Sequence, residues 1–455
     1  MYFRLWCAQF VSSMGDWIGF LAIAALATRV GGGSPETAVG LVMAARIVPG
    51  FFLGPAAGVL VDRWDRKKVM VSCDLVRAAT LLLLPFIDHV WQLLIASLVL
   101  EMCTLLWSPA KEASVPNLVP RDRLTTANSL SLAAAYGTFP FASLVFALLA
   151  KVAQQLGQID ALDWLQINQE AVAFWFDTLT FLISAAIIWR LALPRLSRNE
   201  RQAEHIGARA SWTQAFSELK EGWRFIVGNP VVRAVNLGLA VGLIGGGMLV
   251  PLGPVFSVEV LGAGTPGFGL LTTALGFGVA VGVLAVSVLQ KRVPKEQVFS
   301  GALVVAGVSL ATAASVSWLS IALLAVAVLG VCTGTVYVLG FTLLHQNVSD
   351  ELRGRIFSAL YTLVRLCVLI AFAFGPLLSG LLGNASESLL DDSRFEIGGV
   401  SVFVPGVRLT LWLASAIILG ASALAIRSLR SVTTQPVSPT VGGGVSAQGR
   451  ARADV

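Results

Sequence analysis

The chain has 455 residues, of which 56% are hydrophobic and only 13% are charged. A water-soluble enzyme of this size needs more charge to cover its surface, and a disordered or collagen-like chain has a very different composition. The five cysteines form no CxxC pair, so we expect no disulfide framework, no metal site and no bound cofactor. The apolar residues fall in long runs, which indicates a membrane protein.

Twelve apolar runs are separated by polar breaks, and a helix needs about 20 such residues to cross a bilayer. The first run begins almost at Met1 and has no small-residue cleavage pattern, so we interpret it as a membrane helix and not as a removed leader. The sequence predicts an all-α membrane protein with twelve transmembrane helices at 5–28, 37–61, 69–87, 91–109, 127–151, 172–192, 231–256, 266–289, 297–317, 319–343, 357–383 and 404–427.

The basic residues predict the orientation of these helices. Most of the 32 lysines and arginines fall in loops on one side of the membrane, whereas the other side has few, among them Arg29 and Lys151. The positive-inside rule makes the basic side cytoplasmic. Both termini then lie in the cytoplasm, as an even number of crossings requires, and we expect a multi-pass protein of the plasma membrane, the inner membrane of a bacterium.

Composition divides the chain into four parts. Residues 193–229 are polar and basic with apolar residues near helical spacing, which is typical of an amphipathic cytoplasmic linker. The residues after Arg430 are rich in Gly, Ser, Thr and Pro and are expected to be disordered. We therefore expect a six-helix bundle over 1–192, the linker, a second six-helix bundle over 230–428 and a cytoplasmic tail over 429–455.

The two halves repeat. Pro120 and Ser349 follow the fourth and tenth predicted helices and stand 229 positions apart, and Asp62 and Lys291 are separated by the same number. Two loops with one offset indicate a duplication of six helices. Transporter folds are commonly built this way, with the substrate site at the interface between the repeats.

The loop after the second helix carries a recognisable motif. Residues 58–68, G-V-L-V-D-R-W-D-R-K-K, resemble the loop 2–3 signature of the major facilitator superfamily, G-x-L-x-D-R-x-G-R-[KR], with Asp65 at the second glycine. Further stretches resemble the macrolide-efflux and enterobactin-exporter branch of that family: Phe3–Trp6, Ser13–Asp16, Pro109–Ser129, Asp177–Phe181 and Glu351–Phe357. The resemblance implies two six-helix bundles and transport of a small molecule by alternating access.

The resemblance also implies a mechanical role for the loop 2–3 motif. In this family the loop locks the outward-open state, and the matching residues here are Gly58, Asp62, Arg63, Arg66 and Lys67. Physically, Gly58 permits a close helix approach, and Asp62 can face the positive end of a helix dipole. The alternative is a basic loop that sets only topology.

Two helices carry polar stripes at helical spacing, Gln9, Ser12, Ser13 and Asp16 on the first, and Ser97, Glu101, Thr104 and Ser108 on the fourth. A helix that faces lipid would not carry such stripes, because each charge inside the membrane costs about 2.5–3.5 kcal/mol. We expect Ser13, Asp16 and Glu101 to line a substrate cavity, where a carboxylate can exchange a proton or contact a cationic group. Arg46 is the expected partner, and a permanent ion pair with it is the alternative.

Three further residues are candidates for the cavity: Gly245, Tyr337 and Arg365. Gly245 stands 229 positions after Asp16, in a stretch of the seventh helix rich in Gly and Pro. Such a stretch can form a hinge near the cavity or can allow close helix packing. Both interpretations remain open for Gly245.

Other intramembrane charges are interpreted as structural. Asp74 and Arg77 have i, i+3 spacing on one helix, which suits an ion pair. Asp177 stands near the start of the sixth helix, where a packing or capping role is expected.

Enzymatic motifs are missing from the sequence. No lysine follows a glycine, so no P-loop lysine is present, and HExxH and GxSxG are absent. We expect a monomeric secondary active exporter, driven by protons, of a small amphipathic molecule such as a drug, a macrolide or a siderophore-like compound. The alternatives are an importer or uniporter on the same fold and a membrane sensor or partner protein. The basic loops suit anionic membrane lipids better than nucleic acid.

Overall fold

The computed structural model describes residues 2–61, 64–120, 123–159, 168–191, 229–289, 294–348, 350–389, 394–397 and 400–433. The first half contains α1 (Tyr2–Val30), α2 (Pro35–Val61), α3 (Arg66–Leu83), α4 (Val90–Ser114), α5 (Leu124–Tyr136), α6 (Phe139–Leu156) and α7 (Ala171–Trp189). The second half contains α10 (Pro230–Gly247), α11 (Leu249–Val255), a π-helical turn (Phe256–Val260), α12 (Gly264–Leu289), α13 (Lys295–Ser315), α14 (Leu319–Asn347), α15 (Asp350–Leu389), the hairpin β1 (Arg394–Ile397) and β2 (Val400–Phe403), and α16 (Gly406–Thr433).

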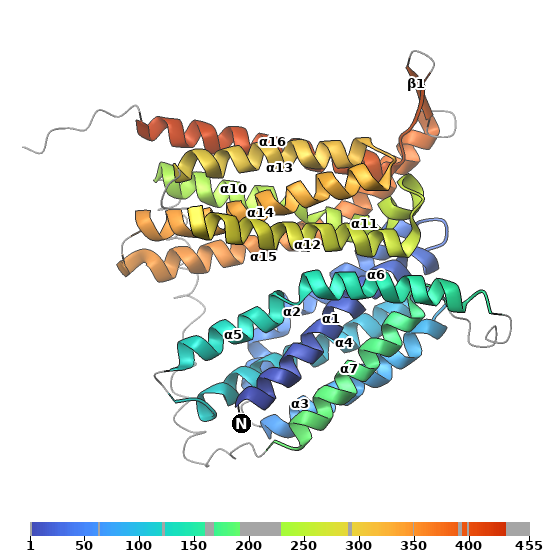
Figure 1. Ribbon diagram of the computed structural model, residues 1–455, viewed down its shortest axis with the longest axis vertical. Coiled ribbons are helices and arrows are strands. Elements are labelled where there is room, and N and C mark those ends of the chain that lie inside the picture. The colour runs from blue at the N-terminus through green and yellow to red at the C-terminus, as the bar shows by residue number, and fades with distance from the viewer. Residues whose placement is uncertain are drawn as a thin grey trace, which may run out of the picture.

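These helices form twelve membrane spans. Eleven are apolar and long enough to cross a bilayer in the part of the chain that the structure describes, and α2, with 27 residues, is the twelfth. Within that count α5 and α6 share one span, and α10, α11 and the π-helical turn share another. Figure 1 shows α1–α7 and α10–α16 as two bundles side by side. The predicted architecture of twelve helices in two six-helix bundles is confirmed.

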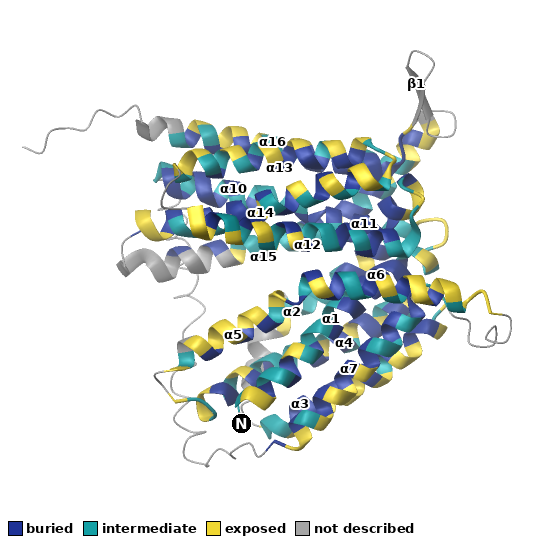
Figure 2. Cartoon of the chain, viewed as in Figure 1, coloured by how far each residue is buried: buried dark blue, intermediate teal, exposed yellow. Residues whose placement is uncertain are grey.

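Each bundle has its own apolar core. In the first bundle the core gathers around Ile18 and Phe174, and in the second around Leu252 and Leu310, all almost fully buried. Many large apolar side chains are exposed, and Figure 2 shows exposed residues, in yellow, along the outer faces of both bundles. In a membrane protein such faces contact lipid tails, which are as apolar as the side chains themselves.

The repeat seen in two loops extends to the helices. The helix α2 begins at residue 35 and α12 at 264, α3 begins at 66 and α13 at 295, and α4 begins at 90 and α14 at 319. Each pair is separated by 229 residues, the offset found in the loops. The two bundles therefore have the same order of helices and nearly the same loop lengths over their first four spans.

The two bundles contact each other near one end of the molecule. Gln169 accepts a hydrogen bond from the Thr265 backbone N–H at 3.1 Å. Close backbone contacts join α6 to α12 and α2 to α15, and they pair Gly269 with Ala147, Gly276 with Pro140 and Gly40 with Pro376. Toward the opposite end, where α5 and α15 begin, the bundles diverge (Figure 1). The molecule is thus closed between the bundles at the end where α2 and α12 begin.

Some helix limits differ from the predicted ones, each for a local reason. The fifth span breaks at Gly137 and Thr138, because Pro140 at the second position of α6 has no backbone N–H to continue α5. The final helix continues past residue 428, the predicted end of the bundle, to Thr433. Ser428 ties this end to α10, since its hydroxyl donates to the Pro230 carbonyl at 2.9 Å. The linker at 192–228 and the tail after Thr433 lie outside the described residues.

The hairpin β1–β2 was not predicted. It pairs antiparallel, with Ile397 opposite Val400. The buried Arg408 at the start of α16 holds its end, because the guanidinium donates to the Phe403 carbonyl at 2.5 Å and to the Ser317 hydroxyl at 2.9 Å. Two carbonyls and a hydroxyl thus accept hydrogen bonds from this arginine near the membrane boundary.

Glycines allow α12 and α14 to cross at very short range. An added Cβ at Gly278 or Gly282 would meet backbone of α14, and one at Gly330 or Gly334 would meet backbone of α12. Both pairs have the small-xxx-small spacing that lets membrane helices approach closely. Packing of backbone against backbone, without side chains between them, therefore holds these two helices together.

This contact predicts the effect of a larger side chain at Gly330. We expect Gly330→Val to destabilise the protein, because overpacking a tight contact costs about 1–3 kcal/mol or more. The melting temperature of the purified protein in detergent should fall by about 1–3 °C, because an unfolding entropy of about 2.1 cal/mol/K per residue is summed over 455 residues. Gly301→Val is the matched control, since nothing lies within 4 Å of the Cβ position at Gly301 in α13. Equal melting temperatures for the two variants would contradict the role of the glycine contact.

Candidate functional site

A cavity of about 790 Å³ lies within the first bundle. Its wall is formed by residues of α1, α2, α3, α4, the turn after α4, and α5. Four aromatic side chains contribute to it: Trp17, Phe20, Trp107 and Tyr136. A cavity of this size falls within the range that holds small organic ligands, about 300–1,000 Å³.

The polar stripe predicted on the first helix faces this cavity. Gln9, Ser13 and Asp16 line it, whereas Ser12 is buried and donates its hydroxyl to the Gln9 carbonyl at 3.2 Å. Arg46 of α2 lines the same cavity and its guanidinium lies 5.8 Å from the centre of the Phe20 ring. The structure therefore brings three of the predicted cavity residues, Ser13, Asp16 and Arg46, to one wall.

The expected ion pair between Asp16 and Arg46 is not formed in this conformation. Among the residues described, ion pairs within 4 Å join Arg29 with Glu170 and Asp74 with Arg77. Asp16 has no hydrogen bond to any of these described residues either, and it is partly exposed in the cavity. Its carboxylate is thus open to a ligand or to water.

The stripe on the fourth helix divides into two parts. Thr104 and Ser108 line the cavity, whereas Ser97 is fully buried. Glu101 is not among the lining residues, and it lies near Gly50 of α2, at the contact between α2 and α4. Glu101 interacts electrostatically with Arg46, so the two predicted partners are close neighbours.

The three candidates of the second half lie elsewhere. Gly245 is buried and its α-carbon packs against Ala414 and Ile418 of α16, so the close-packing interpretation describes its position. Tyr337 is 56% exposed and its ring contacts Phe341 at 4.7 Å between centroids. The side chain of Arg365 in α15 lies outside the described residues.

The loop 2–3 motif is described in part. Gly58 lies in the last turn of α2, and Asp62 and Arg63 lie outside the described residues. Arg66 begins α3, and its guanidinium donates to the Ala113 carbonyl at 2.5 Å. This bond joins the start of α3 to the end of α4, on the side of the molecule where the bundles diverge.

Asp65 replaces a glycine of the family signature, and the structure gives it a role. It is the N-cap of α3, and its carboxylate accepts a hydrogen bond from the Lys68 backbone N–H at 3.2 Å. Such a cap satisfies one of the free N–H groups at a helix start. Lys67 lies over the ring of Trp189, 5.9 Å from its centre, and so joins the loop to the end of α7.

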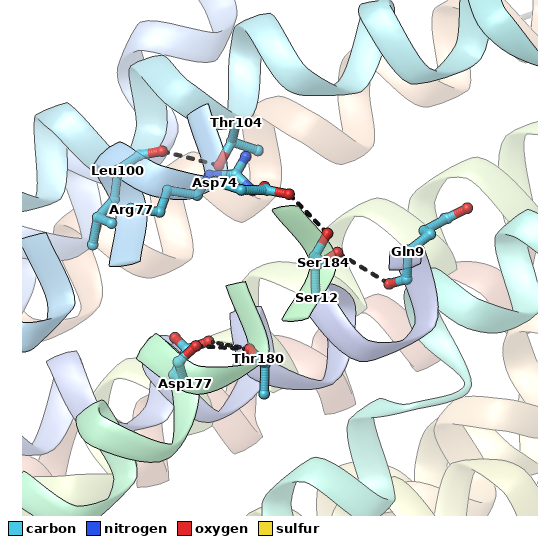
Figure 3. A network of polar contacts seen from close by, with 9 residues as sticks. All are labelled: Gln9, Ser12, Asp74, Arg77, Leu100, Thr104, Asp177, Thr180 and Ser184. Atoms are coloured by element: carbon cyan, nitrogen blue, oxygen red, sulfur yellow. Dashed lines mark hydrogen bonds and ion pairs between the residues drawn. The ribbon is translucent and has the colours of Figure 1, made fainter. Parts of the chain in front are cut away.

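A buried charge network lies beside the cavity (Figure 3). Arg77 forms the predicted pair with Asp74 at 3.6 Å, and Ser184 donates to the other carboxylate oxygen of Asp74 at 2.7 Å. The Arg77 guanidinium also lies 5.0 Å from the centre of the Phe181 ring. Arg77 lines the cavity as well, which the sequence did not predict because the i, i+3 pair suggested a structural role only.

A water-sized crevice continues from this wall toward α7. It is lined by Asp16, Arg46, Arg77 and the fully buried Asp177, among others. The hydroxyl of Thr180 donates to the Asp177 carboxylate at 3.0 Å. Gly15 and Gly19 of α1 leave room for that carboxylate, because an added Cβ at either position would collide with it. Asp177 is therefore a buried carboxylate at the base of the cavity wall and not a helix cap.

Lys111 is a further lining residue that sequence reasoning missed. It was counted with the cytoplasmic basic residues, yet it is 7% exposed and its ammonium donates to the Gln9 side-chain oxygen at 3.4 Å. Gln9 in turn donates to the Ser131 carbonyl of α5 at 3.0 Å. The signal was present in the sequence, because Lys111 continues the stripe of Thr104 and Ser108 at helical spacing.

The described residues contain no group of three or more His, Cys, Asp or Glu side chains that could hold a metal ion. The site consists of carboxylates, guanidiniums, an ammonium, amides and hydroxyls around an aromatic wall. Such a site can bind and orient an amphipathic molecule and can move protons between carboxylates.

Comparison with known proteins places this arrangement in a family. The model of the Major Facilitator Superfamily matches residues 5–371. The chain is 26% identical to the uncharacterized MFS-type transporter YfiS of Bacillus subtilis, over 83% of this chain and 87% of that one. It is 23% identical to macrolide efflux protein A of Streptococcus pyogenes, over 84% and 90%, and 27% identical to the putative bacilysin exporter BacE of Bacillus amyloliquefaciens, over 80% and 84%.

Solved structures share the fold. A bacterial homologue of the human lysosomal transporter Spinster, in an inward-facing and unoccupied conformation, has a TM-score of 0.68 at 15% identity, over 96% of this chain and 98% of that one. A bacterial homologue of the iron transporter ferroportin in the inward-facing state has a TM-score of 0.64 at 14% identity, over 94% and 98%. The family model covers most of the chain and the helices have the matching arrangement. The chain is therefore a multi-pass membrane transporter that belongs to the Major Facilitator Superfamily.

Proposed function

We propose that the protein is a secondary active exporter of a small amphipathic molecule, driven by protons and working as a monomer by alternating access. The observation that carries the proposal is the cavity in the first bundle, which places the unpaired carboxylate of Asp16 among aromatic side chains. Relatives named as a macrolide efflux protein and a putative exporter support the direction of transport.

The wall of the cavity fits an amphipathic ligand. Aromatic faces from Trp17, Phe20, Trp107 and Tyr136 supply apolar surface, and polar groups from α1, α4 and α5 lie between them. Few polar groups placed in an apolar wall are typical of sites that orient a small molecule. A wide aromatic wall tolerates ligands of different shape, as an exporter of foreign compounds requires.

The conformation suits loading from the cytoplasm. The cavity reaches the end of α4 and the start of α5, where Glu112, Pro116 and Leu124 line it. That end is opposite to the contacts between the bundles. By the positive-inside rule it faces the cytoplasm, together with both termini. We therefore propose that the described state is inward-open, in the inner membrane of a bacterium.

Asp16 couples export to the proton gradient in this proposal. A carboxylate in the cavity can hold either a proton or a cationic group of the substrate, and it cannot hold both. Protons that enter from outside then displace the substrate, and substrate from the cytoplasm displaces the proton. This competition is a coupling between two ligands at one site, and by linkage each lowers the affinity for the other.

The loop 2–3 motif acts as the conformational lock in this proposal. The motif runs from the last turn of α2 to the first turn of α3, which we place on the cytoplasmic side. Its residues are Gly58, Asp62, Arg63, Arg66 and Lys67. The bond from Arg66 to Ala113 already joins this loop to α4 within the first bundle. In the outward-open state the same side of the two bundles closes, and Asp62 then becomes available to a helix end of the second bundle.

The orientation is tested by cysteine labelling. We expect single cysteines at Lys68→Cys and Gln346→Cys to be protected from a membrane-impermeant maleimide in intact cells and to be labelled after permeabilisation. Gly33→Cys, in the turn between α1 and α2, should be labelled in intact cells, because nothing lies within 4 Å of its Cβ position. All three positions are exposed. Labelling of Lys68→Cys and Gln346→Cys on opposite sides of the membrane would overturn the topology.

The coupling role is tested by Asp16→Asn. We expect this variant to insert and fold normally, because Asp16 has no ion pair with a described residue. It should lose proton-driven uptake of a radiolabelled macrolide into inverted vesicles, in which the cytoplasmic face of the exporter points outward. Asp88→Asn, an exposed loop carboxylate, should transport as the wild type does. The double variant Asp16→Asn with Arg46→Gln separates the alternatives. Full recovery of transport in the double variant means that Asp16 only balances the charge of Arg46.

The lock is tested by Asp62→Asn. We expect normal expression and a turnover reduced by about tenfold, which corresponds to a change of about 1.4 kcal/mol in the balance between the inward- and outward-open states. Asp65→Asn is the matched control in the same loop, because asparagine caps a helix as well as aspartate does. Wild-type turnover in Asp62→Asn makes the loop a determinant of topology alone.

A further inference from the structure

The cavity has an uneven distribution of charge. Its deep end, near the crevice toward α7, contains Asp16 and Asp177 with the guanidiniums of Arg46 and Arg77. Two further carboxylates stand beside these guanidiniums: Asp74, paired with Arg77, and Glu101, next to Arg46. Four carboxylates thus surround two guanidiniums, and the deep end is rich in acid.

The other end of the cavity contains a buried cation that forms no ion pair within 4 Å with any described residue. Lys111 is 7% exposed, lines the cavity and makes no ion pair within 4 Å among the described residues. Glu112, the exposed next residue on the helix, also lines the cavity and interacts electrostatically with Lys111, but it forms no ion pair with the ammonium within 4 Å. A buried ammonium without a countercharge is costly and calls for an anion.

The surroundings of Lys111 hold its ammonium in the cavity wall. Gln9 gives its amide hydrogens to the Ser131 carbonyl, which turns its oxygen toward Lys111. That bond is long, at 3.4 Å, and uses one of the three ammonium hydrogens. A lysine that merely extends to the water interface would expose its charged end. Lys111 is instead enclosed, with hydrogens left to bind a ligand.

We propose that Lys111, positioned by Gln9, forms a subsite for an anionic group of the substrate, of which a carboxylate is the class that fits. This inference rests on the proposed transport function and adds the chemistry of the substrate to it. A carboxylate bound there forms charge-assisted hydrogen bonds with the ammonium and supplies the missing countercharge. Asn128 of α5 also lines the cavity and offers an amide beside the subsite.

The spacing of the two ends defines the substrate further. Gln9, which binds Lys111, and Asp16 are seven residues apart on α1, and a helix rises about 1.5 Å per residue, so the two levels are about 10 Å apart. Trp17 and Trp107 contribute aromatic rings to the wall of the same cavity. The substrate is therefore a dipolar amphiphile with an anionic group toward Lys111 and a cationic group toward Asp16. A hydrophobic peptide of about three residues has this length.

Binding of trileucine and of its C-terminal amide to the full-length protein in detergent tests the subsite. The two peptides differ only in the carboxylate, and quenching of tryptophan fluorescence detects ligands near Trp17 and Trp107 without any transport step. We expect trileucine to bind the wild type at least about tenfold more tightly than the amide does, since a hydrogen bond to a charged group contributes about 1.5–3 kcal/mol. Lys111→Met should remove this preference and leave binding of the amide unchanged.

Two variants control for structure. Lys111→Arg keeps the charge and should keep the preference for trileucine, and Lys151→Met, which removes an exposed lysine at the end of α6, should behave as the wild type. Three results would overturn the subsite. They are equal affinity of the wild type for the two peptides, no binding of either peptide, and an unchanged preference for trileucine in Lys111→Met. Macrolide efflux that persists under any of these outcomes leaves the proposed transport function intact. Binding of trileucine without its proton-driven uptake into inverted vesicles contradicts the transport function and supports the subsite.

Discussion

The cost of placing a charge inside the membrane determines the arrangement of the first bundle. Each ionised side chain in this region must be paired, be hydrogen-bonded or face a water-filled cavity. Asp74 and Arg77 satisfy the first condition, with Ser184 as an added donor. Asp16 satisfies the third, because it has no charged partner within 4 Å among the described residues and lines the cavity. The cavity and the ion pairs are therefore two solutions to one energetic problem in neighbouring helices.

Glycines make these solutions compatible with tight packing. Gly15 and Gly19 have no side chain, so α1 can pass close to the Asp177 carboxylate of α7. The two helices therefore pack closely although this carboxylate lines the crevice. In the second bundle the equivalent position to Asp16 is Gly245, which packs directly against α16. At this one position the repeated helix thus has a carboxylate that lines the cavity in the first bundle and a close helix contact in the second. Duplication preserved the order and length of the helices while the side chains diverged.

Much of the fold could be predicted because its signals are local. Apolar runs mark the spans. The offset of 229 residues between two loops recurs between the first residues of α2, α3 and α4 and those of α12, α13 and α14. The break in the fifth span was not predicted, because its cause is a single proline, at the second position of α6, and membrane helices often tolerate proline. The hairpin β1–β2 was missed as well, since its end is held by a side-chain contact of Arg408 with the Phe403 carbonyl that forms only in the folded chain.

The site was predicted where one helix carries the signal and missed where several helices create it. The stripe with Ser13 and Asp16 faces the cavity because helical periodicity alone determines which residues share a face. Lys111 looked like a cytoplasmic charge, and only the approach of α1 and α5 encloses it beside Gln9. Glu101 has the right spacing on α4, yet α2 covers it. Burial from a neighbouring helix cannot be read from periodicity.

In the mechanism that we propose, the same energetic constraint links binding to the transport cycle. A transporter that works by alternating access passes through a state in which the cavity is closed on both sides, and water around its charges is then lost. An ionised Asp16 and an unpaired Lys111 make this closure costly when the cavity is empty. A dipolar substrate neutralises both charges at once, whereas a proton neutralises Asp16 alone. Closure with substrate and closure with a proton are therefore favoured over closure of the empty charged cavity. Coupling in such a protein needs no dedicated switch, since the desolvation of two side chains already penalises the uncoupled step.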